Sequence, residues 1–99
     1  MDRAEVIAKL KTAEPRLRAH GVAALYLFGS YARDEARENS DIDVFVDKTP
    51  GRKFGLDDFM GAYAALQQAV PGAEIGYTTR DGIIDCYRPY VEKGAIRIF

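Results

Sequence analysis

Apolar residues recur along this chain with two spacings, one typical of helices and one typical of strands. Residues 2–13 have the helical spacing, and Asp2 stands where it can cap the start of the helix. The apolar face of this helix would consist of Val6, Ile7, Leu10 and Ala13. Pro15 then either kinks the helix or begins a short second helix that ends at Gly21.

Strand patterns occur at four places. Residues 22–28 form an almost continuous apolar run, and residues 41–46 alternate between polar and apolar side chains. The alternation places one set of side chains on a buried face, namely Ile42, Val44 and Val46. Residues 74–78 are a third candidate, and residues 95–99 alternate as a short edge strand would.

Helices are expected in the segments between these strands. Residues 31–37 can form a short helical turn with Ser30 as its cap. Residues 56–70 predict a longer helix, and residues 83–93 are mostly helical but interrupted or restarted at Pro89. The apolar stripe of the longer helix, expected in the core, is Phe59, Met60, Tyr63, Leu66 and Val70. This order of elements predicts an α+β fold, in which a small mixed β-sheet is flanked by helices.

Length and composition narrow the class of protein. With 99 residues, the chain is expected to form a single domain over residues 1–99. Proteins that bind nucleic acid through its phosphates usually carry an excess of basic residues, whereas this chain has a net charge of -1. No apolar run is long enough for a membrane span. Cys86 and His20 are the only residues of their kinds, so no internal disulfide or zinc site is expected. A reducing cytoplasm is the natural location for such a chain.

Two aspartates stand at the head of the second strand. Asp41 and Asp43 would leave the same face of that strand, because successive strand side chains alternate. Two neighbouring carboxylates repel each other, and Mg²⁺ relieves the repulsion because it prefers oxygen ligands and takes others from water and phosphates. Such a pair alone is common at the start of strands, as a solvated edge or a turn cap. Together with a phosphate-binding turn, it indicates metal-assisted phosphoryl or nucleotidyl transfer.

Gly29-Ser30, directly after the first strand, provides such a turn. Glycine lets the backbone approach a phosphate closely, and the amides that follow open a helical turn whose start favours anions. The Ser30 hydroxyl can donate a hydrogen bond to a phosphate oxygen. We expect the Gly-Ser turn and the aspartate pair to lie at the ends of neighbouring strands, where they could hold a metal-bound triphosphate.

Gly29-Ser30, followed after ten residues by Asp41-x-Asp43, resembles the signature of the polymerase beta-type nucleotidyltransferases. The intervening YAR and the segment NSDID strengthen the match. The chain most resembles the minimal nucleotidyltransferases, very short proteins of about this length, many of which are antitoxins beside a helical HEPN-domain toxin. The resemblance extends from the first helix through TTRDGI to the C-terminal YVEKGAIRIF.

This resemblance implies the polymerase beta-type nucleotidyltransferase fold and a reaction in which an acceptor hydroxyl attacks the α-phosphate and pyrophosphate leaves. It implies that Gly29 and Ser30 contact the nucleotide phosphates, and that Asp41 and Asp43 are the catalytic residues that bind two magnesium ions. In the antitoxin members, ATP is the donor of AMP and a tyrosine of the toxin is the acceptor. The implied partner is therefore a HEPN-domain protein.

The chain departs from the family pattern at the third carboxylate. The family usually has an aspartate on a later strand, and alignment on TTRDGI places Gly76 there. Glu74 shares its face but is displaced by roughly 6.7 Å along the strand, and Asp47 lies about 13 Å beyond Asp43. Asp47 is therefore expected to be a strand-end or loop residue. Glu74 is either a solvated strand residue or a substitute ligand.

Three functions stay open on these residues. The first is a magnesium-dependent nucleotidyltransferase of the protein adenylyltransferase type, acting as an antitoxin. The second is a catalytically impaired antitoxin that neutralises its toxin by contact alone, and Gly76 favours it. The third is a subunit that binds ATP without transferring it. Covalent modification of a partner distinguishes the first from the others. A small molecule or an RNA end is a less favoured acceptor, because the chain is short and mildly acidic.

Overall fold

The N-terminal helices form where the apolar spacing predicts them. The structure is a computed structural model that describes all 99 residues. Helix α1 spans Arg3–Lys11, and the Asp2 side chain caps it by accepting a hydrogen bond from the Glu5 amide at 2.8 Å. Helix α2 spans Glu14–Ala19 with Pro15 in its first turn, so Pro15 begins a second helix rather than kinking the first.

Four strands form one mixed sheet in the order β3-β2-β1-β4. The strands are β1 (Val22–Phe28), β2 (Ile42–Lys48), β3 (Ile75–Thr79) and β4 (Ile96–Arg97). Strand β1 is antiparallel to both β2 and β4, whereas β2 and β3 are parallel. The expectation of a small mixed sheet with a short edge strand near the C-terminus is confirmed.

The remaining helical segments are α3 (Gly29–Ala32), α4 (Leu56–Ala69), the 3₁₀ turn η1 (Arg80–Gly82) and α5 (Arg88–Gly94). No helix of the chain combines the length and the apolar character that a membrane crossing requires. Two expectations for these segments are wrong. Ser30 lies inside α3 and is not its cap, because the helix already begins at Gly29. Residues 83–87 are a bend and a turn rather than helix, whereas the restart expected at Pro89 is confirmed, because Pro89 stands in the first turn of α5.

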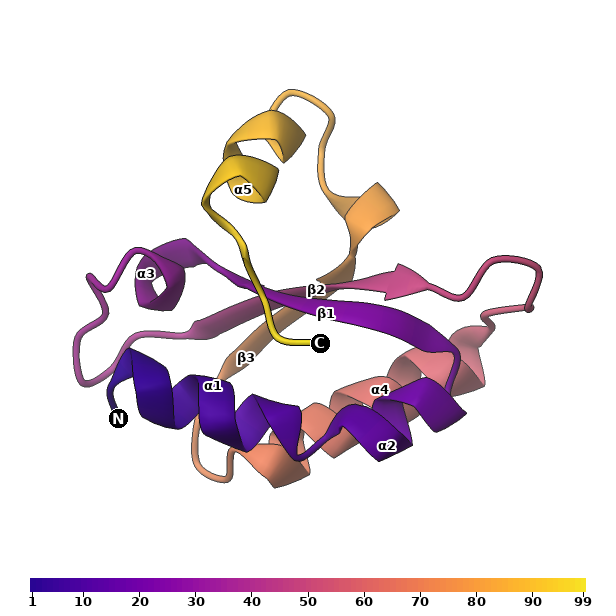
Figure 1. Ribbon diagram of the computed structural model, residues 1–99, viewed down its shortest axis with the longest axis horizontal. Coiled ribbons are helices and arrows are strands. Elements are labelled where there is room, and N and C mark those ends of the chain that lie inside the picture. The colour runs from indigo at the N-terminus through magenta and orange to yellow at the C-terminus, as the bar shows by residue number, and fades with distance from the viewer.

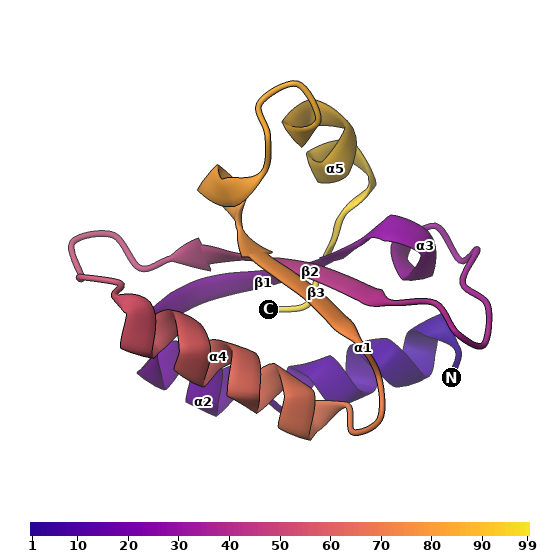
Figure 2. The same ribbon diagram turned by 180° about the vertical axis from the view of Figure 1, so that it is seen from behind.

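Helices α1, α2 and α4 cover one face of the sheet, and η1 and α5 lie on the opposite face, as Figures 1 and 2 show. The hydrophobic core fills the space between the sheet and the three helices. The sheet contributes Val22, Leu25, Leu27, Ile42, Val44, Val46 and Ile75 to this core. The helical layer contributes Val6, Leu10, Ala13, Leu17, Ala62, Ala65, Leu66 and Val70. The alternate strand positions point to the other side, here called the site face, and include Tyr26, Phe28, Asp43, Phe45 and Asp47.

Helix α4 packs through small residues as well as through its predicted apolar stripe. Its buried residues are Ala62, Ala65 and Leu66. Phe59 and Tyr63 are half-buried, and both rings stack on Tyr77 of β3, with centroid distances of 4.5 and 5.7 Å. The expectation that Met60 belongs to the core is wrong, because its side chain is 54% exposed. Met60 lies about 120° around the helix axis from Leu66, which turns it away from the sheet.

Candidate functional site

Strand pairing brings the two sequence motifs together at one end of the sheet. Phe28, the last residue of β1, pairs with Asp43 near the start of β2. Gly29 therefore begins α3 beside Asp43, and Asp41 lies one residue before β2. The expectation that the Gly-Ser turn and the aspartates lie at the ends of neighbouring strands is confirmed, because the end of one antiparallel strand meets the start of the other.

Gly29 occupies a position that other residues would strain. Its φ angle is 73°, in the left-handed region that glycine adopts most easily. A Cβ atom at this position would also lie 2.4 Å from Oδ2 of Asp43. The Asp43 carboxylate therefore lies directly against the backbone of the Gly-Ser turn, which places the proposed phosphate-binding and metal-binding groups in contact.

Gly76 borders the same carboxylate from the other side. Asp43 is paired with Gly76 of β3, and a Cβ atom at position 76 would lie 2.5 Å from Oδ1 of Asp43. This is the position at which the family resemblance expects the third carboxylate. The Asp43 carboxylate thus lies between two glycines, Gly29 and Gly76, and fills part of the space that a side chain at position 76 would need.

Glu74 does not replace the missing carboxylate in this structure. It lies just before β3, where its backbone carbonyl accepts a hydrogen bond from the Ile42 amide at 2.9 Å. Glu74 and Asp41 line the same cavity of about 450 Å³, beside Ser40. However, no three His, Cys, Asp or Glu side chains come close enough together to hold a metal ion. The site therefore has the carboxylates of Asp41 and Asp43 without a third ligand of this kind.

Electrostatics at the site favour a bound cation. Partial burial raises the pKa of Asp43 above its ordinary value, and the neighbouring Asp41 carboxylate raises this pKa further. The Arg33 guanidinium acts in the opposite direction and lowers the pKa of Asp43. Arg33 is itself paired with Glu35, with its Nε at 2.8 Å from a carboxylate oxygen. The repulsion between Asp41 and Asp43 is therefore only partly compensated within the chain.

This donor set fits one Mg²⁺ ion whose remaining ligands are water and phosphate oxygens. Two carboxylates and several non-protein oxygens are a usual ligand set for this ion. Asp41 and Asp43 would hold the ion, and the adjacent Gly29 backbone would bring the phosphates to it. A second ion would lack a dedicated carboxylate, because position 76 carries no side chain.

Replacing Asp43 by asparagine is expected to stabilise the metal-free fold at neutral pH. A carboxyl group whose pKa is raised by folding contributes stability below the unfolded-state pKa, and loses it as pH rises through the folded-state pKa. The asparagine side chain cannot ionise, so the D43N variant should unfold at a higher temperature than the parent at pH 7. The difference should shrink below the ordinary pKa of 3.8. Thermal unfolding at pH 7 and pH 3, followed by circular dichroism, measures this, and a less stable variant at pH 7 would contradict it.

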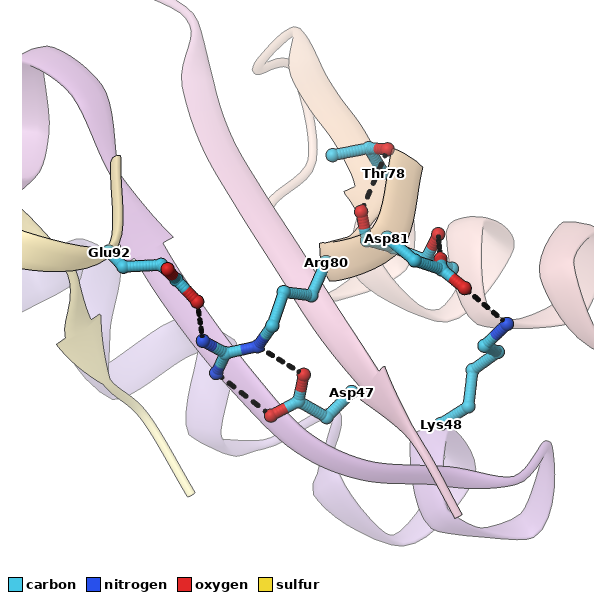
Figure 3. A network of polar contacts seen from close by, with 7 residues as sticks. Asp47, Lys48, Thr78, Arg80, Asp81 and Glu92 are labelled. Atoms are coloured by element: carbon cyan, nitrogen blue, oxygen red, sulfur yellow. Dashed lines mark hydrogen bonds and ion pairs between the residues drawn. The ribbon is translucent and has the colours of Figure 1, made fainter. Parts of the chain in front are cut away.

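A charged network on the site face was not predicted from the sequence (Figure 3). Arg80 donates from Nε to Oδ1 of Asp47 at 2.6 Å and from Nη2 to Oδ2 at 2.9 Å. Arg80 also forms an ion pair with Glu92 of α5. Asp47 is thus engaged by arginine near the end of β2 and is not part of the candidate metal site. In the sequence, only the position of Arg80 within TTRDGI pointed to this network. The two partners of Arg80, Asp47 and Glu92, are 33 and 12 residues away along the chain, so no local pattern connects them.

Comparison with known proteins adds an independent finding. Residues 6–87 match the family described as "Nucleotidyltransferase domain". A relative from Methanocaldococcus jannaschii, named "Putative protein adenylyltransferase", is 40% identical to this chain over 55 residues. That alignment covers 48% of this chain and 59% of the relative. The chain therefore matches less than two thirds of that relative's length.

Solved structures agree with the sequence comparison. One, described as a "putative minimal nucleotidyltransferase", has a TM-score of 0.79 and 31% identity, and the match covers 97% of this chain and 95% of that chain. A second, described as "the toxin-antitoxin with AMP-PNP", has a TM-score of 0.65 and 18% identity over 100% of this chain and 73% of that one. At 18% identity, the second structure supports the fold and nothing more specific.

Proposed function

Because the chain belongs to the nucleotidyltransferase domain family and has its polymerase beta-type fold, we propose that it transfers AMP from ATP to a hydroxyl of a partner protein. The observation that carries this proposal is the contact between Gly29 of the Gly-Ser turn and Asp43 of the aspartate pair. Pairing of Phe28 with Asp43 brings the Gly29 backbone against the Asp43 carboxylate. This supports the proposal, because nucleotide transfer needs a group that binds phosphate beside a group that binds the metal.

The proposed reaction is an in-line displacement at the α-phosphorus. The acceptor oxygen forms a bond to the α-phosphorus, the bond from this phosphorus to the bridging oxygen breaks, and pyrophosphate leaves with that oxygen. The acceptor hydroxyl loses its proton to solvent. Gly29 and Ser30 bind the phosphates and fix their orientation, while Asp41 and Asp43 would hold a Mg²⁺ ion. That ion would neutralise part of the phosphate charge.

We further propose that the partner is a HEPN-domain toxin, with this chain as the antitoxin. The HEPN domain of the partner is what the family resemblance implies, and two observations support a protein acceptor and an antitoxin role. The relative from Methanocaldococcus jannaschii carries the name of a protein adenylyltransferase, and a structure of the same fold is described as a toxin-antitoxin with AMP-PNP. The acceptor would then be a protein hydroxyl presented at the end of the sheet by the partner.

An alternative is supported by Gly76. Without a third carboxylate, the site lacks a dedicated ligand for a second metal ion, which would lower the pKa of the acceptor hydroxyl. ATP binding could therefore persist while transfer is slow. The protein would then act as a nucleotide-binding or purely protein-binding antitoxin. This alternative differs from the main proposal in a single observable, which is covalent modification of the partner.

The test is an intact mass measurement on the protein encoded by the neighbouring gene. That protein is incubated with this chain, ATP and Mg²⁺, and a D41N/D43N double variant serves as the control. A mass gain equal to one adenylyl group, which is AMP less one water, is the expected result, and it should be absent with the control. A stable complex of the two proteins without any mass gain would overturn the transfer proposal in favour of the binding alternative.

Restoring a carboxylate at position 76 is expected to raise the rate of transfer by roughly tenfold or more, since metal ligation at such sites contributes several kcal/mol. In the G76D variant, the new side chain would lie beside Asp43, whose flexible carboxylate must turn away to make room for it. The initial rate of AMP incorporation measures the effect. A G76N variant is the matched control, because asparagine has nearly the same size but no charge. An equal rate in G76N and G76D would contradict the argument.

A further inference from the structure

Residues 80–94, here called the arm, cross the site face without entering the hydrophobic core. The arm consists of η1, the turns that follow it and α5, and it stands on the side of the sheet opposite α4 in Figures 1 and 2. Neither η1 nor α5 contains a buried residue. Apolar burial therefore contributes little to holding this segment in its position, and it is limited to half-buried residues such as Ile83 and Val91.

Charged contacts centred on Arg80 hold the arm instead. The Arg80 guanidinium lies 4.9 Å from the ring centroids of both Tyr26 and Phe45, so it stacks on the aromatic part of the site face. From there it bonds Asp47 of β2 with two hydrogen bonds and reaches Glu92 of α5 (Figure 3). The Arg80 guanidinium thus connects α5 to the sheet. This fixes the position of α5, which is the far end of the arm.

The far end of the arm forms one wall of a cleft beside the candidate site. The cleft has a volume of about 300 Å³. Its lining residues are Phe28, Gly29, Arg33, Tyr90, Val91 and Gly94. Gly29 belongs both to this cleft and to the turn that is proposed to bind phosphates. A ligand whose phosphates lie on the turn can therefore place its remaining part in the cleft.

The chemistry of the cleft suits a nucleoside better than a further phosphate. Phe28, Val91 and the ring of Tyr90 present apolar and aromatic surface, and Arg33 provides a single cation near the Gly29 end. Flat bases stack on such aromatic side chains. Tyr90 is 79% exposed, so its ring is free to contact a ligand. The arm carries a second exposed tyrosine, Tyr87, which does not line the cleft.

We propose that the cleft between α3 and α5 binds the nucleoside of the donor nucleotide and that Tyr90 contacts the base. Arg80 is the positioning residue, because its ion pair with Glu92 fixes the position of α5, which forms one wall of the cleft. This inference rests on the proposed function, because the phosphates of the same nucleotide are placed on the Gly-Ser turn. The cleft would be the part of the site that distinguishes a nucleotide, which has a nucleoside, from inorganic triphosphate, which has none.

Calorimetric titration with two ligands tests the proposal, namely ATP and inorganic triphosphate, each with Mg²⁺. The parent protein is expected to bind ATP about tenfold or more tightly than triphosphate, which is the size of effect that stacking of one base produces. The Y90A variant should lose most of this difference by weakening ATP binding alone, and Y90F should retain it. The matched control is Y87A, which removes the other exposed arm tyrosine and should leave both affinities unchanged.

The positioning role of Arg80 has its own pair of variants. The E92Q variant removes the charge from the link between Arg80 and α5 and should weaken ATP binding by about threefold or more, with triphosphate binding unchanged. The control is K48Q, which breaks the ion pair between Lys48 and Asp81, 2.7 Å long, where the arm begins at η1, and leaves the link from Arg80 to α5 intact. Hydrogen exchange should be faster in residues 90–94 of E92Q and unchanged in β1 and β2.

Each remaining outcome decides between the proposals. Equal affinity of the parent for ATP and triphosphate, or equal effects of Y90A and Y87A, would overturn the nucleoside cleft while leaving the proposed function intact. Failure of the parent to bind either ligand would overturn both. Unchanged ATP binding by Y90A, combined with slower modification of the partner, would assign the cleft to the acceptor protein and overturn the inference.

Discussion

Loss of both site carboxylates, in the D41N/D43N variant, is expected to lower the rate of nucleotide transfer about a thousandfold or more. A metal held by these two groups would stabilise developing charge by several kcal/mol, and each 1.4 kcal/mol corresponds to a factor of about ten in rate. Asp43 is the central residue, since its carboxylate lies against Gly29 and beside Asp41. The rate of AMP incorporation into the partner, followed by intact mass, measures the loss.

Binding measurements separate this effect from damage to the fold. Because asparagine removes a repulsive charge, the double variant should be at least as stable as the parent in the absence of Mg²⁺. The part of ATP binding that depends on Mg²⁺ should disappear, while any binding without the metal should persist. Transfer at the parental rate by the folded double variant would show that Asp41 and Asp43 do not hold a catalytic metal.

Truncation of Phe45 is expected to cause the largest loss of stability among single substitutions on the site face. Phe45 is 1% exposed and stacks on Tyr26 with a centroid distance of 4.8 Å and an interplanar angle of 8°. It also lies under the Arg80 guanidinium. Phe45→Ala would leave a cavity in the sheet and should lower the free energy of unfolding by about 3–5 kcal/mol.

Chemical denaturation followed by circular dichroism measures this loss, and F45L provides the control. Leucine fills most of the space, so F45L should cost less than about 1.5 kcal/mol. At about 4–8 °C per kcal/mol for a domain of this size, F45A should also lower the midpoint of thermal unfolding by at least about 12 °C. A loss below about 1 kcal/mol in F45A would mean that the aromatic cluster does not stabilise the sheet.

Local patterns were sufficient to predict most of the secondary structure. The apolar run at residues 22–28 coincides with β1. The alternating pattern at residues 41–46 starts one residue before β2, which begins at Ile42. Asp2 caps α1 as its side-chain chemistry predicts. These features depend on neighbours in the sequence, because strand alternation and helix capping are set within a few residues.

The wrong expectations concern positions where the local pattern was ambiguous. Met60 is apolar and close to the buried stripe of α4, yet the direction in which α4 meets the sheet leaves it exposed. Residues 83–87 are compatible with a helix in isolation, but the helix forms only from Arg88 onward. In both cases, the deciding contacts come from parts of the chain that the spacing of apolar residues cannot specify.

The order of the elements, the paired motifs and the departure at Gly76 can all be read from the residues in their linear order. Which distant residues meet depends on how the chain folds. The register of β2 with β1 and β3 places Asp43 between Gly29 and Gly76, and the path of the arm brings Glu92 to Arg80. Strand register and the position of the arm arise from the packing of the whole core and from contacts between distant segments. A short stretch of sequence therefore cannot encode them.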